Sequence, residues 1–236
     1  MPSNWAAFLR FLRTETERTG ALLVVDEVVS GFRWSPGGAQ QAYGVTGDLT
    51  ALAKILAGGL PGGAVAGRAD VMAPLAFEPE VRRGLPKVAH PGTFNANPLS
   101  AAAGVACLEL VADPSVQQRA SASAAAVRTG MNSVLAELGV PGSVYGAASM
   151  FRIELGGDQV PPPTDLRAPL PSQEPDVHWT PGIAEKALNL HMLMRGVALF
   201  GGRGILSIAH SEEVIATTVS AFRESVTAVA DAGLIG

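Results

Sequence analysis

Hydrophobic residues recur along the chain at two spacings, which predict a helix followed by a buried strand. Trp5, Phe8 and Leu12 follow the period of an amphipathic helix, and Gly20 is a typical helix end. Residues 22–26 open with four consecutive apolar side chains, which is typical of a strand buried on both faces of a sheet. This order of elements is characteristic of an α/β sheet.

The rest of the first half adds two short strands and one apolar helix. Residues 49–53 and 64–67 are the strand candidates, and the loop AGGLPGG separates them. After a second loop, PGTFNANP, residues 99–111 form a helix that is apolar or small nearly all round, so we expect it to be buried. About three strands are few for a self-sufficient doubly wound sheet.

The second half has the pattern of a smaller α+β unit. Asp113 and Pro114 begin a helix that ends at Gly139. Residues 156–176 are rich in proline without periodicity, which predicts a long surface loop. The other expected elements are strands at 143–145 and 150–155, a helix from Thr180 to Gly196, two short strands flanking GGRG, and a final helix capped by Ser211. We therefore predict two domains, residues 1–112 and 113–236.

Composition narrows the class of protein. The chain has 236 residues, 47% of them hydrophobic, which is enough to bury a core. The net charge of −4 comes without a basic stripe, so no nucleic-acid partner is expected. No apolar run approaches the ~18 residues of a membrane span. The single cysteine, Cys107, indicates a reducing, cytoplasmic location, and the four histidines lack metal-ligand spacing.

The acidic pair Asp26-Glu27, at the end of the first apolar run, is the first candidate for chemistry. A carboxylate there is costly unless it meets a cation, which could be Mg²⁺ on a nucleotide, a protonated ring nitrogen of a cofactor, or an internal arginine. The nucleotide alternative requires G-x-x-x-x-G-K-[ST]. The chain has three lysines (Lys54, Lys87 and Lys186) and none follows glycine, so an ATPase site is not expected.

A pyridoxal phosphate site needs two residue types that the chain offers. A carboxylate keeps the ring nitrogen of this cofactor protonated, and a lysine of lowered pKa binds its aldehyde as a Schiff base. Lys54 lies between an apolar strand and a glycine loop, although a lone lysine in such a context can equally be a surface residue. Glu27, next to Asp26, is interpreted as structural, bonding a backbone amide.

Four blocks carry a resemblance to a known family: DEVVSGFR, GAQQAYGVTGDLTALAKILAGGLPGGAVAGR, HPGTFNANPLSAAAG and GGRGILSIAHSEEVIATTVSAF. In this order and spacing they resemble the class III, pyridoxal-phosphate-dependent aminotransferases, nearest the glutamate-1-semialdehyde 2,1-aminomutase branch. The resemblance extends from about Phe8 to Phe222. It implies a partial aspartate-aminotransferase-like (fold type I) α/β large domain followed by a carboxyl-terminal α+β small domain.

The resemblance also implies roles for individual residues. Asp26 would pair with the pyridine nitrogen and Val28 would pack against the ring face. Lys54 would hold the cofactor as a Schiff base and then shuttle protons between the substrate carbon and the cofactor. The substrates would be a small-molecule amino donor and acceptor. Thr93 would bond the cofactor phosphate of a neighbouring subunit, which implies a homodimer.

The sequence also departs from this family. Members are nearly twice as long, and the amino-terminal part with its Gly-Ser phosphate turn, stacking aromatic residue and substrate arginine has no counterpart here. Gly202 stands where an acidic residue is expected in the aminomutases, so a broader aminotransferase activity stays open. Three hypotheses follow: a piece of a full enzyme, a half completed by a separate amino-terminal polypeptide, or a non-catalytic interaction domain.

Overall fold

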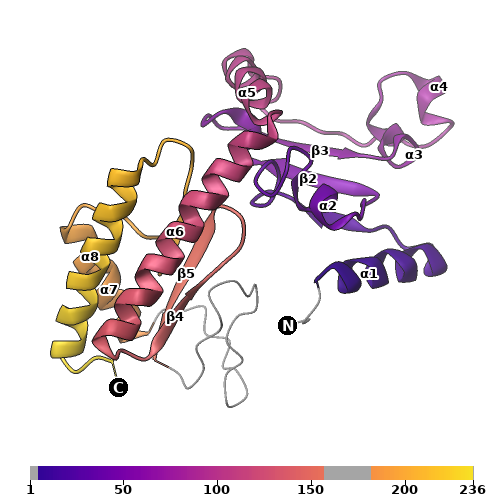
Figure 1. Ribbon diagram of the computed structural model, residues 1–236. Helices are drawn as coiled ribbons and strands as arrows, with labels where there is room; N and C mark the ends of the chain where they lie inside the picture. The colour runs from indigo at the N-terminus through magenta and orange to yellow at the C-terminus, as the bar shows by residue number, and fades with distance from the viewer. Residues whose placement is uncertain (1–4, 157–181, 236) are drawn as a thin grey trace. The chain divides into compact units, whose positions relative to one another are not determined.

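The computed structural model describes residues 5–156 and 182–235, and these fall into two compact units that divide between Gln117 and Gln118 (Figure 1). We call residues 2–117 the first unit and residues 118–236 the second unit. The predicted loop over residues 156–176 and the predicted helix start at Thr180 lie almost wholly outside the described residues.

The first unit is built on a small mixed sheet (Figure 1). Its strand order is β1-β2-β3, with β1 parallel to β2 and β2 antiparallel to β3. The sheet follows helix α1 and carries the 3₁₀ helix η1 directly after β2. The elements are α1 (Trp5–Thr19), β1 (Val24–Asp26), α2 (Gly38–Tyr43), β2 (Leu49–Ala53), η1 (Lys54–Ala57), β3 (Gly63–Gly67), α3 (Ala69–Met72), η2 (Ala73–Leu75), α4 (Pro79–Arg82) and α5 (Pro98–Val111).

Two predictions of burial in the first unit are wrong for this chain. Val24 in β1 is 60% exposed, and of the three residues of β1 only Val25 is partly buried. In α5 only Gly104 and Val111 are buried, whereas Leu99 is 69% exposed. The apolar pattern predicted the elements correctly, but burial depends on a covering surface that the described residues do not provide.

The second unit is an antiparallel sheet covered by long helices (Figure 1). The strands β4 (Gly142–Tyr145), β5 (Met150–Leu155) and β6 (Arg203–Ile205) pair in the order β4-β5-β6. The helices α6 (Pro114–Leu138), α7 (Ile183–Met194) and α8 (Glu212–Asp231) pack with the sheet around one core. Fully buried members of that core are Val127, Met131, Ile153, Leu188, Met192, Phe222, Val226 and Val229.

Helix starts in both units have side-chain caps, of which Ser211 was predicted and Asn97 was not. The Ser211 hydroxyl accepts a hydrogen bond from the Val214 amide at the start of α8. The Asn97 side chain accepts bonds from the amides of Leu99 and Ser100 at the start of α5. Such bonds satisfy amides that a helix leaves without intrahelical partners.

The two strands predicted around GGRG are replaced by one strand and a tight turn. Phe200 and Arg203 exchange two backbone hydrogen bonds, of 2.9 and 3.2 Å, across Gly201 and Gly202. Both glycines have positive φ, +55° and +66°, which is the geometry of a two-residue type I′ hairpin turn. The turn therefore closes directly onto β6, and no strand precedes it in the described chain.

No single helix within 5–156 and 182–235 has the length and hydrophobicity to cross a membrane. The pair α5 and α6, bent by 80° at the break between them, meets the length and composition criteria only when taken together.

Truncation of the central aromatic side chain tests the core of the second unit. Phe222→Ala should lower the free energy of unfolding by about 3–5 kcal/mol, because it removes a side chain with no exposed surface. Phe200, which is 81% exposed, provides the control, and Phe200→Ala should change stability by less than about 0.5 kcal/mol. Urea unfolding followed by far-UV circular dichroism measures both, and equal effects would contradict this assignment of the core.

Candidate cofactor site at the ends of β1 and β2

The two adjacent acids at the end of β1 have different surroundings. Glu27 is only 1% exposed. Its carboxylate accepts hydrogen bonds from the amides of Gln40 (2.7 Å) and Ala39 (3.2 Å) and from the hydroxyl of Ser30. These amides lie in the first turn of α2, where backbone N–H groups lack intrahelical partners and favour negative charge. The interpretation of Glu27 as a structural residue that bonds backbone amides is confirmed.

Asp26 is exposed and lacks such a set of donors. Its Oδ1 atom accepts one hydrogen bond, of 2.8 Å, from the amide of Val28, which is itself half-buried. Within residues 5–156 and 182–235, no arginine or lysine forms an ion pair with Asp26. The internal-arginine alternative therefore has no support in the described chain, and the carboxylate is accessible to an external cation.

The parallel pairing of β1 and β2 brings Asp26 and Lys54 to the same edge of the sheet. Asp26 pairs with Ala51, and Lys54 begins η1 three positions beyond Ala51. The carboxyl ends of parallel strands are where α/β sheets bind ligands. Lys54 is exposed and forms no ion pair with another described residue.

The backbone of Lys54 is strained. Its φ angle is +53°, in the left-handed region, where a residue with a side chain costs about 1–3 kcal/mol. Non-glycine residues are held in such conformations only when the surrounding structure fixes them, and they cluster at functional sites.

Thr93 lies on an exposed turn just before α5. Asn95 fixes this turn, because its side-chain amide donates to the His90 carbonyl (3.0 Å) and its backbone N–H donates to the Gly92 carbonyl (3.0 Å). The turn leads into α5, and α5 packs against η1, the element that Lys54 begins. No hydrogen bond joins Thr93 to Asp26 or Lys54 in the described chain, so the structure brings Asp26 and Lys54 to one sheet edge but does not link Thr93 to them.

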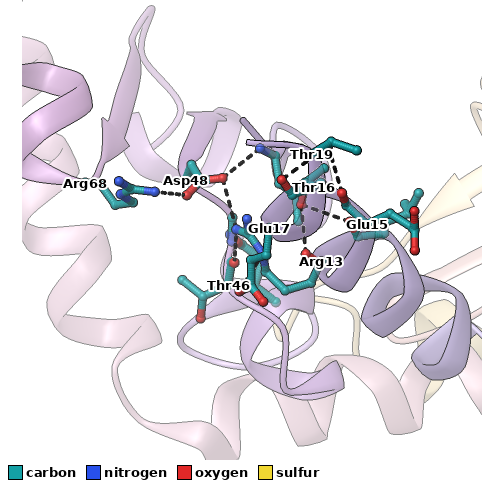
Figure 2. Close-up of polar contacts among 12 residues, drawn as sticks. Arg13, Glu15, Thr16, Glu17, Thr19, Thr46, Asp48 and Arg68 are labelled. Carbon is teal, nitrogen blue, oxygen red and sulfur yellow. Dashed lines mark hydrogen bonds and ion pairs between the residues drawn. The ribbon is translucent and has the colours of Figure 1, made fainter. Parts of the chain in front are cut away.

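Sequence analysis missed the buried acid that organises the opposite end of the same strands. Asp48 is 2% exposed and precedes β2 (Figure 2). Its Oδ2 atom accepts from the Leu23 amide (2.8 Å) and from Arg13 on α1 (3.0 Å), and its Oδ1 atom accepts from Arg68 after β3 (2.7 Å). The only sequence signal was an aspartate directly before an apolar strand.

Asp48 remains ionised far below neutral pH. The hydrogen bond from the Leu23 amide, followed by those from Arg68 and Arg13, lowers the pKa of its carboxyl group from 3.8 to about 2. Bonding to Asp70 and Asp48 correspondingly raises the pKa of Arg68. Asp48 therefore joins α1, the residue before β1 and the residue after β3, and its ion pairs with Arg13 and Arg68 require its negative charge.

The buried Glu27 and the exposed Asp26 should respond to the same isosteric change by very different amounts. Glu27→Gln should lower the free energy of unfolding by about 1.5–3 kcal/mol, because one carboxylate oxygen that accepts hydrogen bonds in a buried site becomes a donor. Asp26→Asn should change it by less than about 0.5 kcal/mol, since that side chain is exposed. Urea unfolding of both variants provides the comparison, and a larger loss for Asp26→Asn would contradict these roles.

The lowered pKa of Asp48 predicts a stability contribution that depends on pH. Because the folded-state pKa of about 2 lies below the ordinary 3.8, this contribution is complete above about pH 4 and is lost as the pH falls toward 2. The difference in unfolding midpoint between the parent chain and Asp48→Asn should therefore be largest above pH 4 and shrink toward pH 2. Urea titrations across this range measure it, and a difference that does not vary with pH would refute the prediction.

The fold of the described chain is that of the fold type I transaminases. A transaminase structure described with pyridoxal phosphate bound matches 99% of this chain at 31% identity and a TM-score of 0.79, and the chain covers 50% of it. An ω-transaminase from Sphaerobacter thermophilus matches 98% of the chain at 35% identity, with the same TM-score, and the chain covers 49% of it. The predicted partial fold type I architecture is confirmed.

The chain is a member of the class III aminotransferase family, whose model matches residues 2–167. The glutamate-1-semialdehyde 2,1-aminomutase of Thermomicrobium roseum is 36% identical over 95% of this chain, and that of Laribacter hongkongensis is 34% identical over 93%. The chain spans about half the length of these curated relatives, 49% and 48% respectively. The family resemblance found in the sequence, and its restriction to part of the relatives' length, are confirmed.

Proposed function

We propose that this chain carries half of a pyridoxal-phosphate-dependent amino-transfer site, of the kind used by aminotransferases and glutamate-1-semialdehyde aminomutases. The observation that supports this most is the placement of Asp26 and Lys54 at the carboxyl ends of adjacent parallel strands, with no opposite charge paired to either in the described chain. The substrates would be a small-molecule amino donor and acceptor.

The residues present fit the cofactor by their chemistry. Asp26 offers an accessible carboxylate for a protonated ring nitrogen, and the half-buried Val28 offers an apolar contact for the ring. Lys54 offers an accessible amine at the same sheet edge. The cofactor, when bound, supplies an electron sink for the electron pair left on a substrate carbon after loss of its proton.

In the proposed mechanism Asp26, Lys54 and Thr93 have separate roles. The Asp26 carboxylate would accept a hydrogen bond from the protonated ring nitrogen and so keep the proton on it. The Lys54 amine would hold the cofactor, and once freed by the substrate amine it would remove and return the proton at the substrate carbon. The Thr93 hydroxyl would donate a hydrogen bond to the cofactor phosphate of a neighbouring subunit.

The proposed site requires a further protein surface, which a homodimer or a complementing amino-terminal polypeptide would supply. Two features of the first unit support this. Thr93 is exposed on its turn and forms no hydrogen bond with Asp26 or Lys54 in the described chain. The apolar side chains of Leu99, Val105 and Leu110 on α5 are 69%, 57% and 65% exposed, which is typical of interaction surfaces.

The unpaired Cys107 supports a cytoplasmic location.

The second candidate function is a non-catalytic assembly domain, and the exposed apolar surface of α5 is what favours it. Mixing this chain with the amino-terminal half of the Thermomicrobium roseum relative separates the two functions. Amino transfer that appears only in the mixture would support the enzyme. A stable but inactive complex in the presence of pyridoxal phosphate would support the assembly domain.

Removal of one amine tests the proposed site directly. Purified chain with added pyridoxal phosphate should develop the near-visible absorbance band of lysine-bound cofactor, and Lys54→Ala should abolish it because Lys54 supplies the amine in the proposed site. Lys186→Ala, which changes an exposed lysine of α7, is the matched control and should leave the band unchanged. Equal loss in both variants, or a full band in Lys54→Ala, would contradict the assignment.

A further inference from the structure

The element that begins with Lys54 packs against α5 at a distance that only glycine permits. A Cβ atom on Gly58 would lie 2.4 Å from the carbonyl oxygen of Ala103 in α5. A Cβ atom on Gly104 would lie 2.7 Å from the carbonyl oxygen of Leu56 in η1. The backbone of α5 therefore contacts Gly58, and the backbone of η1 contacts Gly104. The carbonyl groups of Ala103 and Leu56 occupy the space that a side chain at each glycine would fill.

This contact adjoins the strained residue. Lys54, with φ +53°, starts η1, and Gly58, with φ +61°, ends it by donating its N–H to the Ile55 carbonyl (3.1 Å). The strand side of Lys54 is fixed because Ala53 pairs with Gly63 of β3. On the other side of Lys54, the close contact with α5 limits how far η1 can relax. A strained backbone persists only where its neighbours fix it from both directions.

We propose that Gly104 is a positioning residue for Lys54, because the glycine contact between α5 and η1 holds the lysine backbone in its left-handed conformation. The proposal deepens the proposed function and rests on it for the role of Lys54. Gly104 is buried and helical, so a substitution there can disturb the contact without straining the backbone, whereas Gly58 also needs its positive φ.

The expected displacement follows from contact distances. Carbon–oxygen contacts in proteins lie at about 3.3 Å or more, so a methyl group at position 104 would move η1 and α5 apart by about 0.6 Å. Alanine also raises the intrinsic helix propensity of α5. Gly104→Ala should therefore loosen η1 while leaving the helix itself intact, which a general loss of folding would not do.

Hydrogen exchange of the intact chain measures this without any cofactor. In Gly104→Ala the amides of residues 54–58 should exchange about tenfold faster than in the parent chain, while those of α8 remain unchanged. Ala106→Ser, which enlarges an exposed residue of the same helix, is the control and should leave residues 54–58 unaffected. Gly58→Ala approaches the same contact from the η1 side and should also speed exchange, which keeps the proposal testable if one variant fails to fold.

A second readout reports on the amine. Brief treatment with pyridoxal phosphate, then borohydride, with mass spectrometry of the labelled peptides, gives the labelling rate of Lys54 relative to Lys186. Gly104→Ala should lower this ratio at least about threefold. Unchanged exchange at residues 54–58 in both glycine variants would overturn the positioning role. Accelerated exchange, together with parent-chain labelling of Lys54 no faster than that of Lys186, would instead support the glycine contact and contradict the proposed function.

Discussion

The parallel pairing of β1 with β2 is the interaction on which the candidate site depends. It is only three residue pairs long, from Val24↔Leu49 to Asp26↔Ala51. Asp48 fixes one end, since it accepts a hydrogen bond from the Leu23 amide and ion-pairs with Arg13 and Arg68. The opposite end presents Asp26 and Lys54. A shift of one residue in this register would exchange the faces of every side chain, which is why so short a pairing needs a strong anchor.

Adjacent acids at a strand end have separate tasks because successive residues there face opposite ways. Glu27 turns into the unit, where amides of α2 stabilise its charge, and no ion pair with Glu27 occurs within residues 5–156 and 182–235. Asp26 remains exposed with a single bond to its own loop. The proposed cofactor would give a function to the accessible carboxylate of Asp26 and to the amine of Lys54.

Local patterns in the sequence predicted the elements well and their environment less well. β2 and β5 have the bounds that the apolar runs predict, and Ser211 caps α8 as expected. The exposure of α5 could not be predicted. Its apolar residues indicate that the helix packs against another surface, but they do not show whether that surface belongs to the same chain.

The candidate site was predictable to a different extent. Asp26 and Lys54 follow from strand ends and a family resemblance, while the hub at Asp48 depends on arginines 35 and 20 residues away that no local pattern joins to it. The turn at Gly201-Gly202 was missed because two glycines in sequence fit either a loop between strands or a tight hairpin turn, and only the hydrogen bonds of Phe200 and Arg203 decide between them.

The exposed apolar surface of α5 makes the thermodynamics of the first unit depend on its surroundings. A unit with little buried apolar area has little reserve of stability of its own, and any molecule that binds the folded form alone adds to that stability in proportion to the logarithm of its concentration. If a partner covers α5, the melting temperature of this unit would rise with the concentration of that partner. Cellular supply of whatever surface covers α5 would set how much of the chain is folded at any moment, and so control its abundance through turnover.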